Sequence, residues 1–260
     1  MSSKKSKATQ RSNAGRAAER AAAIRAEQER SERRRRAVIV GAVVLVVIAV
    51  VVGIGIAVQS GRDTTGQVAT PPSGTVDQYA VPFGQPDAPV TVGVYEDFMC
   101  PFCGQFEAAS GDQLEKYVAD GDVQVQYHVV SFLDRASNGT DYSTRAMNAY
   151  GVVLDVAGPQ TAKKFHDLLY ENQPEENSDG LSDDQLIDFA VQAGAPREQV
   201  AGPIESGKFE QWVTNATEAA SQAGVTGTPT VMVDGEQVQG ATIGELVDAM
   251  QTRIEESLQG

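Results

Sequence analysis

The sequence predicts an α/β sandwich with a helical insertion, preceded by one transmembrane helix. Three observations lead to this prediction. An uncharged apolar run occupies residues 37–58, two strand-like segments flank a helical pattern after residue 89, and a block of helical patterns separates them from a later β-hairpin. Alternating or β-branched apolar residues indicate strands, whereas an apolar repeat of three to four residues indicates helices.

Charge divides the chain into two parts. Residues 1–36 carry twelve basic and four acidic side chains, whereas the remainder carries nine basic and 31 acidic ones, a net charge of −22. We interpret residues 1–36 as a cytoplasmic arm that contacts anionic lipid. Nucleic-acid binding is disfavoured, because the arm contains no aromatic side chain that could stack on bases.

The apolar run at residues 37–58 is long enough to span a membrane, since a helix of this length would measure about 33 Å. Four arginines at positions 33–36 precede it, so the positive-inside rule predicts a cytoplasmic N-terminus. A cleavable signal peptide, the alternative, would have a shorter apolar region and a small-residue cleavage site. We interpret residues 59–79 as a flexible linker and residues 80–260 as an extracytoplasmic domain.

The extracytoplasmic part opens with residues 81–89, an extended segment with three prolines. A β-branched strand is predicted at residues 90–95, a helix at 105–119 and an alternating strand at 123–130. The insertion, at about residues 138–223, contains four helical patterns. They cover residues 140–156, 161–171, 182–193 and 209–223.

The last predicted elements are a hairpin and a helix. Residues 225–233 and 237–240 flank Asp234-Gly235, a pair typical of two-residue hairpin turns. Residues 243–258 have the pattern of an amphipathic helix. The order strand, helix, strand, helical block, hairpin and helix predicts a thioredoxin-like fold with a helical insertion.

The only two cysteines, Cys100 and Cys103, stand three positions apart directly after the first strand. At this spacing both thiols lie on one face of a helical turn and can close a small disulfide. We therefore predict a redox dithiol, with a short structural bridge or two inert thiols as alternatives. A lone pair does not complete a four-ligand zinc site, and neither His128 nor His166 stands at ligand spacing from it, so we expect no metal and no cofactor.

Three segments resemble the DsbA-like thiol–disulfide oxidoreductases: residues 84–92, residues 95–103 around the dithiol, and residues 225–231 around Pro229. The resemblance covers about residues 80–258. It implies a thioredoxin-like fold and disulfide exchange in an extracytoplasmic compartment, where disulfides form and persist.

Cys100 is predicted to be the nucleophile, because a helix N-terminus favours the thiolate and lowers its pKa. Pro101 suits the first helical position, which needs no N–H, and Cys103 would be the more buried, resolving thiol. The strongest oxidants of the family resemble Cys-Pro-His-Cys. Since Phe102 supplies no charge in place of that histidine, we expect a smaller lowering of the Cys100 pKa. Phe102 itself is either a packing residue or a substrate contact.

The resemblance also implies a cis Pro229 beside the disulfide, with the Thr228 backbone free to pair with an extended substrate. A plain turn proline is the alternative, and Thr228 in place of valine resembles the isomerase branch. Some members carry a buried acid where this chain has Val94. Glu96, two residues on and on the same strand face, is either a substitute that tunes the dithiol or a surface acid.

These observations predict a membrane-anchored enzyme that donates disulfides to reduced or unfolded secreted proteins. Its oxidising partner would resemble the quinone-linked DsbB or vitamin K epoxide reductase families. The alternatives are an extracytoplasmic reductase or isomerase, and a non-enzymatic peptide-binding or chaperone module. We expect His128 and His166 to be structural, and Trp212 and Phe209 to lie in a helical core.

Overall fold

The computed structural model describes residues 69–260. The basic arm, the predicted membrane span and most of the predicted linker, at residues 1–68, lie outside the described residues. Across residues 69–260, no helix combines the length and the apolarity needed to cross a bilayer. The final part of the predicted linker, residues 69–79, lies against the domain. There the indole Nε1 of Trp212 donates a hydrogen bond of 2.7 Å to the carbonyl of Gln78.

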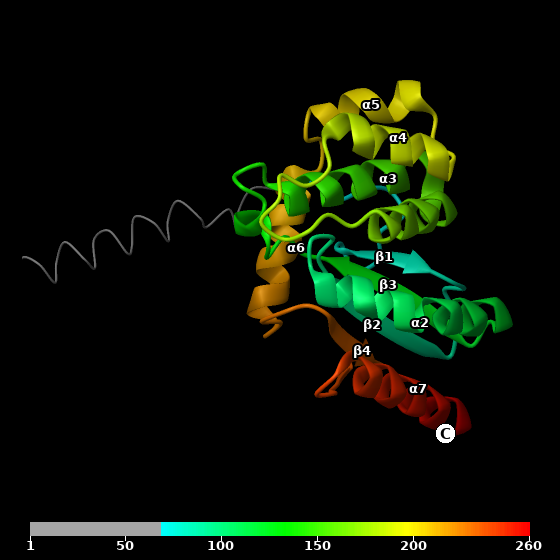
Figure 1. Cartoon of the computed structure of the whole chain (residues 1–260). Coiled ribbons are helices and arrows are strands. Elements are labelled where there is room, and N and C mark those ends of the chain that lie inside the picture. The colour runs from blue at the N-terminus through cyan, green and yellow to red at the C-terminus, as the bar shows by residue number, and fades with distance from the viewer. Residues whose placement is uncertain (1–68) are drawn as a thin grey trace, which may run out of the picture. The chain divides into compact units, whose positions relative to one another are not determined.

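A mixed sheet of five strands forms the centre of the described part (Figure 1). The strands are β1 (Ala80–Phe83), β2 (Val90–Glu96), β3 (Val123–Val129), β4 (Thr230–Val233) and β5 (Glu236–Val238), in the order β1-β3-β2-β4-β5. Only β2 and β3 are parallel; the other pairs are antiparallel. The two segments predicted as strands and the hairpin are confirmed. The strand β1 lies where only an extended segment is predicted.

Six α-helices and one 3-10 turn are described between residues 69 and 260. They are α2 (Pro101–Asp120), η1 (Asp134–Ala136), α3 (Tyr142–Glu171), α4 (Asp183–Ala193), α5 (Arg197–Glu205), α6 (Glu210–Gln222) and α7 (Ile243–Gln259). The predicted helices 140–156 and 161–171 are the two halves of α3, which meet at the non-helical Gly158 (φ 78°). The sequence pattern does not reveal α5, because the helix is short and contains Pro203.

Helix α3 begins the insertion, and α4 and α5 pack beside it (Figure 1). The main core lies where α2, α3 and α7 meet one face of the sheet, which carries Val90, Val92 and Val94. Tyr95 points to the opposite face, where it joins a smaller apolar cluster under α6. Trp212 and Phe209 are buried in the main core, as predicted from their helical pattern.

The strand register brings two distant segments to the same edge of the sheet. Because β2 and β4 are antiparallel with Tyr95 opposite Thr230, the end of β2 lies beside the start of β4. Cys100 follows β2 within a few residues, and Pro229 directly precedes β4. The fold therefore places the dithiol and the proline loop next to each other although about half the chain separates them.

Candidate functional site

Cys100 is the N-cap residue of α2, and Pro101 lies in the first helical turn. The Cys100 carbonyl accepts the backbone N–H groups of Cys103 at 3.0 Å and Gly104 at 3.2 Å, which closes the first turn of the helix. Both thiols are free in this structure, with Cys100 4% exposed and Cys103 fully buried. Both residues are thus buried, with Cys103 slightly more so than Cys100.

The surroundings of the two thiols shift their pKa values in opposite directions. A hydrogen bond from the Cys103 side chain is the main cause that lowers the pKa of Cys100 to about 6. The Thr228 side chain and the backbone N–H groups of Cys103 and Phe102 act in the same direction. Burial raises the pKa of Cys103 well above its ordinary value, and the charges of Cys100 and Glu96 add to this effect. At neutral pH the arrangement thus holds a thiolate at Cys100 and a thiol at Cys103.

A pH titration of the free dithiol should reveal this asymmetry. Because the thiolate fraction of Cys100 increases as pH rises through about 6, its alkylation rate should rise about tenfold per pH unit below that value and level off above it. The measurement is the rate of iodoacetamide modification against pH. In Cys103→Ala the midpoint should move upward, because the strongest hydrogen bond to the sulfur is lost. A wild-type midpoint near the ordinary value of about 8.5 would contradict the assignment.

The proline loop closes the site on the other side of Cys100. The Thr228–Pro229 peptide bond is cis, as the resemblance implies. In its protonated form the Cys100 thiol donates a hydrogen bond of 3.3 Å to the carbonyl of Thr228. Phe102 is 57% exposed, so of its two expected roles the packing role is excluded by its position. An exposed aromatic ring and an extended loop thus flank the sulfur of Cys100.

Asp97 connects the loop before Cys100 to two other segments. It is fully buried, and its Oδ1 accepts hydrogen bonds from the Ser143 hydroxyl at 2.6 Å and the Met99 N–H at 2.9 Å. Its Oδ2 accepts the Leu133 N–H at 2.9 Å. Burial raises the pKa of Asp97 to about 7, although these three hydrogen bonds act in the opposite direction. The sequence shows the acid beside the dithiol but not this role, since two of its three partners, Leu133 and Ser143, lie 36 and 46 positions away.

Gln173, just after α3, holds the same loop from the insertion. Its Nε2 donates hydrogen bonds to the carbonyls of Cys100 at 2.9 Å and Phe98 at 3.1 Å. A Cβ on Gly104 would clash with its Oε1, so a side chain at position 104 would displace Gln173 from this loop. The insertion therefore takes part in shaping the turn that carries the dithiol.

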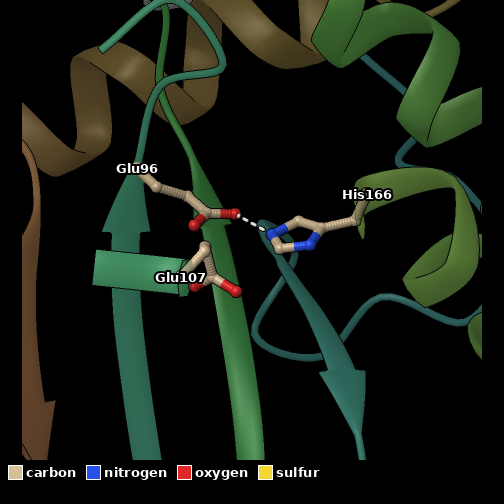
Figure 2. A group of neighbouring side chains, drawn as sticks. All are labelled: Glu96, Glu107 and His166. Atoms are coloured by element: carbon tan, nitrogen blue, oxygen red, sulfur yellow. Dashed lines mark hydrogen bonds and ion pairs between the residues drawn. The ribbon is translucent and has the colours of Figure 1, made fainter. Parts of the chain in front are cut away.

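Glu96 is buried rather than a surface acid, which corrects one of its two expected roles. It is 1% exposed, and its Oε1 lies 2.6 Å from Nε2 of the fully buried His166 (Figure 2). Burial alone would lower the pKa of His166, but the Glu96 carboxylate and its hydrogen bonds to Glu96 and Asp167 raise it to about 10. His166 is thus structural, as expected, but it is also the charge partner of Glu96, whose charge acts on Cys103. His128 instead stacks on Tyr95 at 4.3 Å between ring centroids.

Comparison with known proteins supports the fold. A family profile described as "Thioredoxin" matches residues 77–252. A second profile, the N-terminal domain of Rv3627c-like carboxypeptidases, matches residues 29–78, most of which lie outside the described residues. The serine/threonine-protein kinase PknE of Mycobacterium tuberculosis is 31% identical over 161 residues, which make up 60% of this chain but only 28% of the kinase.

Two solved structures cover the described domain more fully. The oxidised DsbA of Mycobacterium tuberculosis is 32% identical with a TM-score of 0.58, over 70% of this chain and 93% of that protein. MdbA of Actinomyces oris, a thiol-disulfide oxidoreductase, is 26% identical with a TM-score of 0.57, over 68% and 85% of the two chains. With its dithiol at the N-terminus of α2 and a cis proline beside it, the chain belongs to the DsbA-like thiol–disulfide oxidoreductases of the thioredoxin fold.

Proposed function

We propose that this protein donates disulfides to reduced secreted or cell-envelope proteins through the Cys100–Cys103 couple. The pKa of Cys100, lowered to about 6, carries the proposal, because a stabilised thiolate stabilises the reduced form of the enzyme. A disulfide that gives a stable dithiol on reduction is an oxidant.

In the proposed reaction, a substrate thiolate attacks the Cys100 sulfur of the oxidised enzyme. The Cys100–Cys103 bond breaks, Cys103 leaves and takes up a proton, and Cys100 is joined to the substrate in a mixed disulfide. A second substrate thiolate then attacks the substrate sulfur of this bond, which releases the oxidised product and the Cys100 thiolate. The two electrons of the substrate dithiol thus remain on the enzyme.

The high pKa of Cys103 determines how the first step ends. Burial and the nearby Glu96 charge disfavour a thiolate at this position, so the leaving sulfur is retained as a thiol. We assign Glu96, with His166 as its partner, the role of tuning this proton affinity. Pro101 contributes by starting the helix whose N–H groups stabilise Cys100.

We assign the substrate contact to Phe102, Thr228 and Pro229. An extended peptide can pair with the backbone of the loop at Thr228, while the exposed ring of Phe102 covers apolar side chains next to the reacting sulfur. Neither contact selects a particular side chain. The expected substrates are therefore reduced, unfolded chains of varied sequence.

The reduction potential of the couple tests the direction of transfer. In thioredoxin the nucleophilic cysteine has a pKa of about 7 and the couple has a reduction potential of about −270 mV. In DsbA the corresponding pKa is about 3.5 and the reduction potential is about −120 mV. A pKa of about 6 lies between them, so we expect a potential of about −180 to −240 mV. The measurement is equilibration of the purified full chain in glutathione buffers, followed by thiol trapping.

A potential at or below about −270 mV would make the dithiol a reductant and would contradict disulfide donation. The second candidate function, reduction or isomerisation of disulfides, would then take its place. Thr228 before the cis proline is the observation that favours it.

The cycle also needs an oxidant that returns the enzyme to the disulfide form. We propose a quinone-linked membrane oxidase, similar to the DsbB or vitamin K epoxide reductase families, as this partner. Residues 37–58 would anchor the chain close to it, with the N-terminus in the cytoplasm and the dithiol outside.

A further inference from the structure

Three acid–base side chains converge in the interior behind the dithiol. Glu96 ends β2, Glu107 lies on α2 and His166 on α3, and each offers one ligand atom within 4.8 Å of the others. Figure 2 shows both carboxylates on the same side of the imidazole. Sequence spacing does not reveal the group, because His166 is 70 positions from Glu96. Neither cysteine belongs to it.

Two carboxylate oxygens of this group lack hydrogen-bond partners among the described residues. They are Oε2 of Glu96 and Oε1 of Glu107, and both are buried. The Glu107 residue as a whole is partly exposed, but its Oε1 is buried. Buried carboxylate oxygens are ordinarily satisfied, so these two unpartnered oxygens beside one imidazole leave two free ligand atoms for a bound cation.

A cleft gives this group access to solvent. It has a volume of about 330 Å³, lies between α2 and α3, and is lined by Glu107. Its walls carry five carboxylates and one ammonium group, that of Lys163. The Lys163 ammonium already forms salt bridges with Asp167 at 2.6 Å and with Glu115 at 3.2 Å. The cleft therefore attracts cations and leads them to Glu107.

The imidazole is already oriented as in a metal site. Nδ1 of His166 lies 3.1 Å from the Asp167 carboxylate, so this nitrogen carries a proton and Nε2 faces the two glutamates. A carboxylate that holds the remote nitrogen of a histidine is the usual outer partner of a histidine that ligates a metal.

We propose that Glu96, Glu107 and His166 bind a divalent transition metal ion, with Zn²⁺ as the best match. Zinc accepts both imidazole nitrogen and carboxylate oxygen as ligands, whereas Ca²⁺ and Mg²⁺ prefer oxygen ligands alone. Zinc at ligand distances of about 2.0–2.2 Å needs ligand atoms about 3.4 Å apart. The 2.6 Å contact of Glu96 with His166 therefore opens when the ion replaces the shared proton, and Glu107 moves inward. Water completes the coordination.

Cobalt and zinc titrations of the full chain test this site, independently of the proposed activity. The protein is first oxidised, so that the disulfide removes both cysteines as ligands, and is treated with chelator. We expect one equivalent of Co²⁺ to produce visible d–d absorption, and Zn²⁺ to displace it. Affinity for Zn²⁺ is measured by competition with a chromophoric chelator.

Glu107→Gln should weaken Zn²⁺ binding by at least about 10–100-fold, the loss that even an outer partner of a ligand causes. Asp167→Asn should weaken it by about 10–100-fold and serves as the second variant if Glu107→Gln does not fold. The matched control is Glu115→Gln, which removes a carboxylate from the same cleft but not from the ligand group; its affinity should equal that of the wild type.

Three results would overturn the proposal. One is the absence of stoichiometric binding to the oxidised protein. Another is binding that appears only after reduction, which would assign the metal to the dithiol. The third is an equal loss of affinity in Glu107→Gln and Glu115→Gln. That result would show that the affinity depends on the overall negative charge of the cleft and not on Glu107 as a ligand.

Discussion

Replacing Cys100 with serine should abolish disulfide transfer to a reduced peptide, with a loss of at least about 10³-fold, a conservative figure for removal of a nucleophile. The hydroxyl forms no disulfide, and no other cysteine can replace Cys100, because Cys103 is the only other one and is fully buried. The measurement is the rate of oxidation of a dithiol peptide by the full chain in glutathione buffer.

Cys103→Ser is the matched variant. It leaves Cys100 at the start of α2 but removes the thiol that competes with the substrate, so mixed disulfides with substrates should accumulate and be visible on non-reducing gels. If Cys100→Ser still oxidised the peptide, the assignment of the nucleophile would be wrong. If it instead retained full biological function without transfer, the chain would act as a peptide-binding module.

Asp97→Ala should lower the free energy of unfolding by at least about 3 kcal/mol, because each buried donor left without a partner costs about 1–3 kcal/mol. Three donors lose their acceptor in this variant: the backbone N–H groups of Met99 and Leu133 and the hydroxyl of Ser143. The loss affects the loop that carries Cys100, the segment after β3 and the start of α3 together. Urea denaturation of the reduced protein measures it.

Two controls separate this effect from a general change of charge. Asp97→Asn keeps an acceptor oxygen of the same shape and should lose less stability than alanine. Asp112→Ala removes an exposed acid and should change the unfolding free energy by less than about 0.5 kcal/mol. An equal, small effect in all three variants would show that Asp97 does not hold these segments together.

Local patterns predicted most of the elements correctly. The β-branched run of β2, the alternation of β3 and the Asp234-Gly235 turn each report a conformation that neighbouring residues decide, since both turn residues have positive φ. The dithiol and the cis proline are likewise local, so the sequence and its resemblance identified both. The helix α5 and the strand β1 were missed because one contains Pro203 and the other is short and close to prolines.

What the sequence by itself determined is therefore the chemistry of the site: two cysteines at helical spacing, a proline for the first turn and a proline loop before a strand. Only the tertiary structure decided their electrostatic environment. The contact of Glu96 with His166 and the hydrogen bonds of Asp97 with Leu133 and Ser143 join residues 36 to 70 positions apart in the chain. Such distances carry no local signal, because the charge of a buried group depends on which elements pack around it.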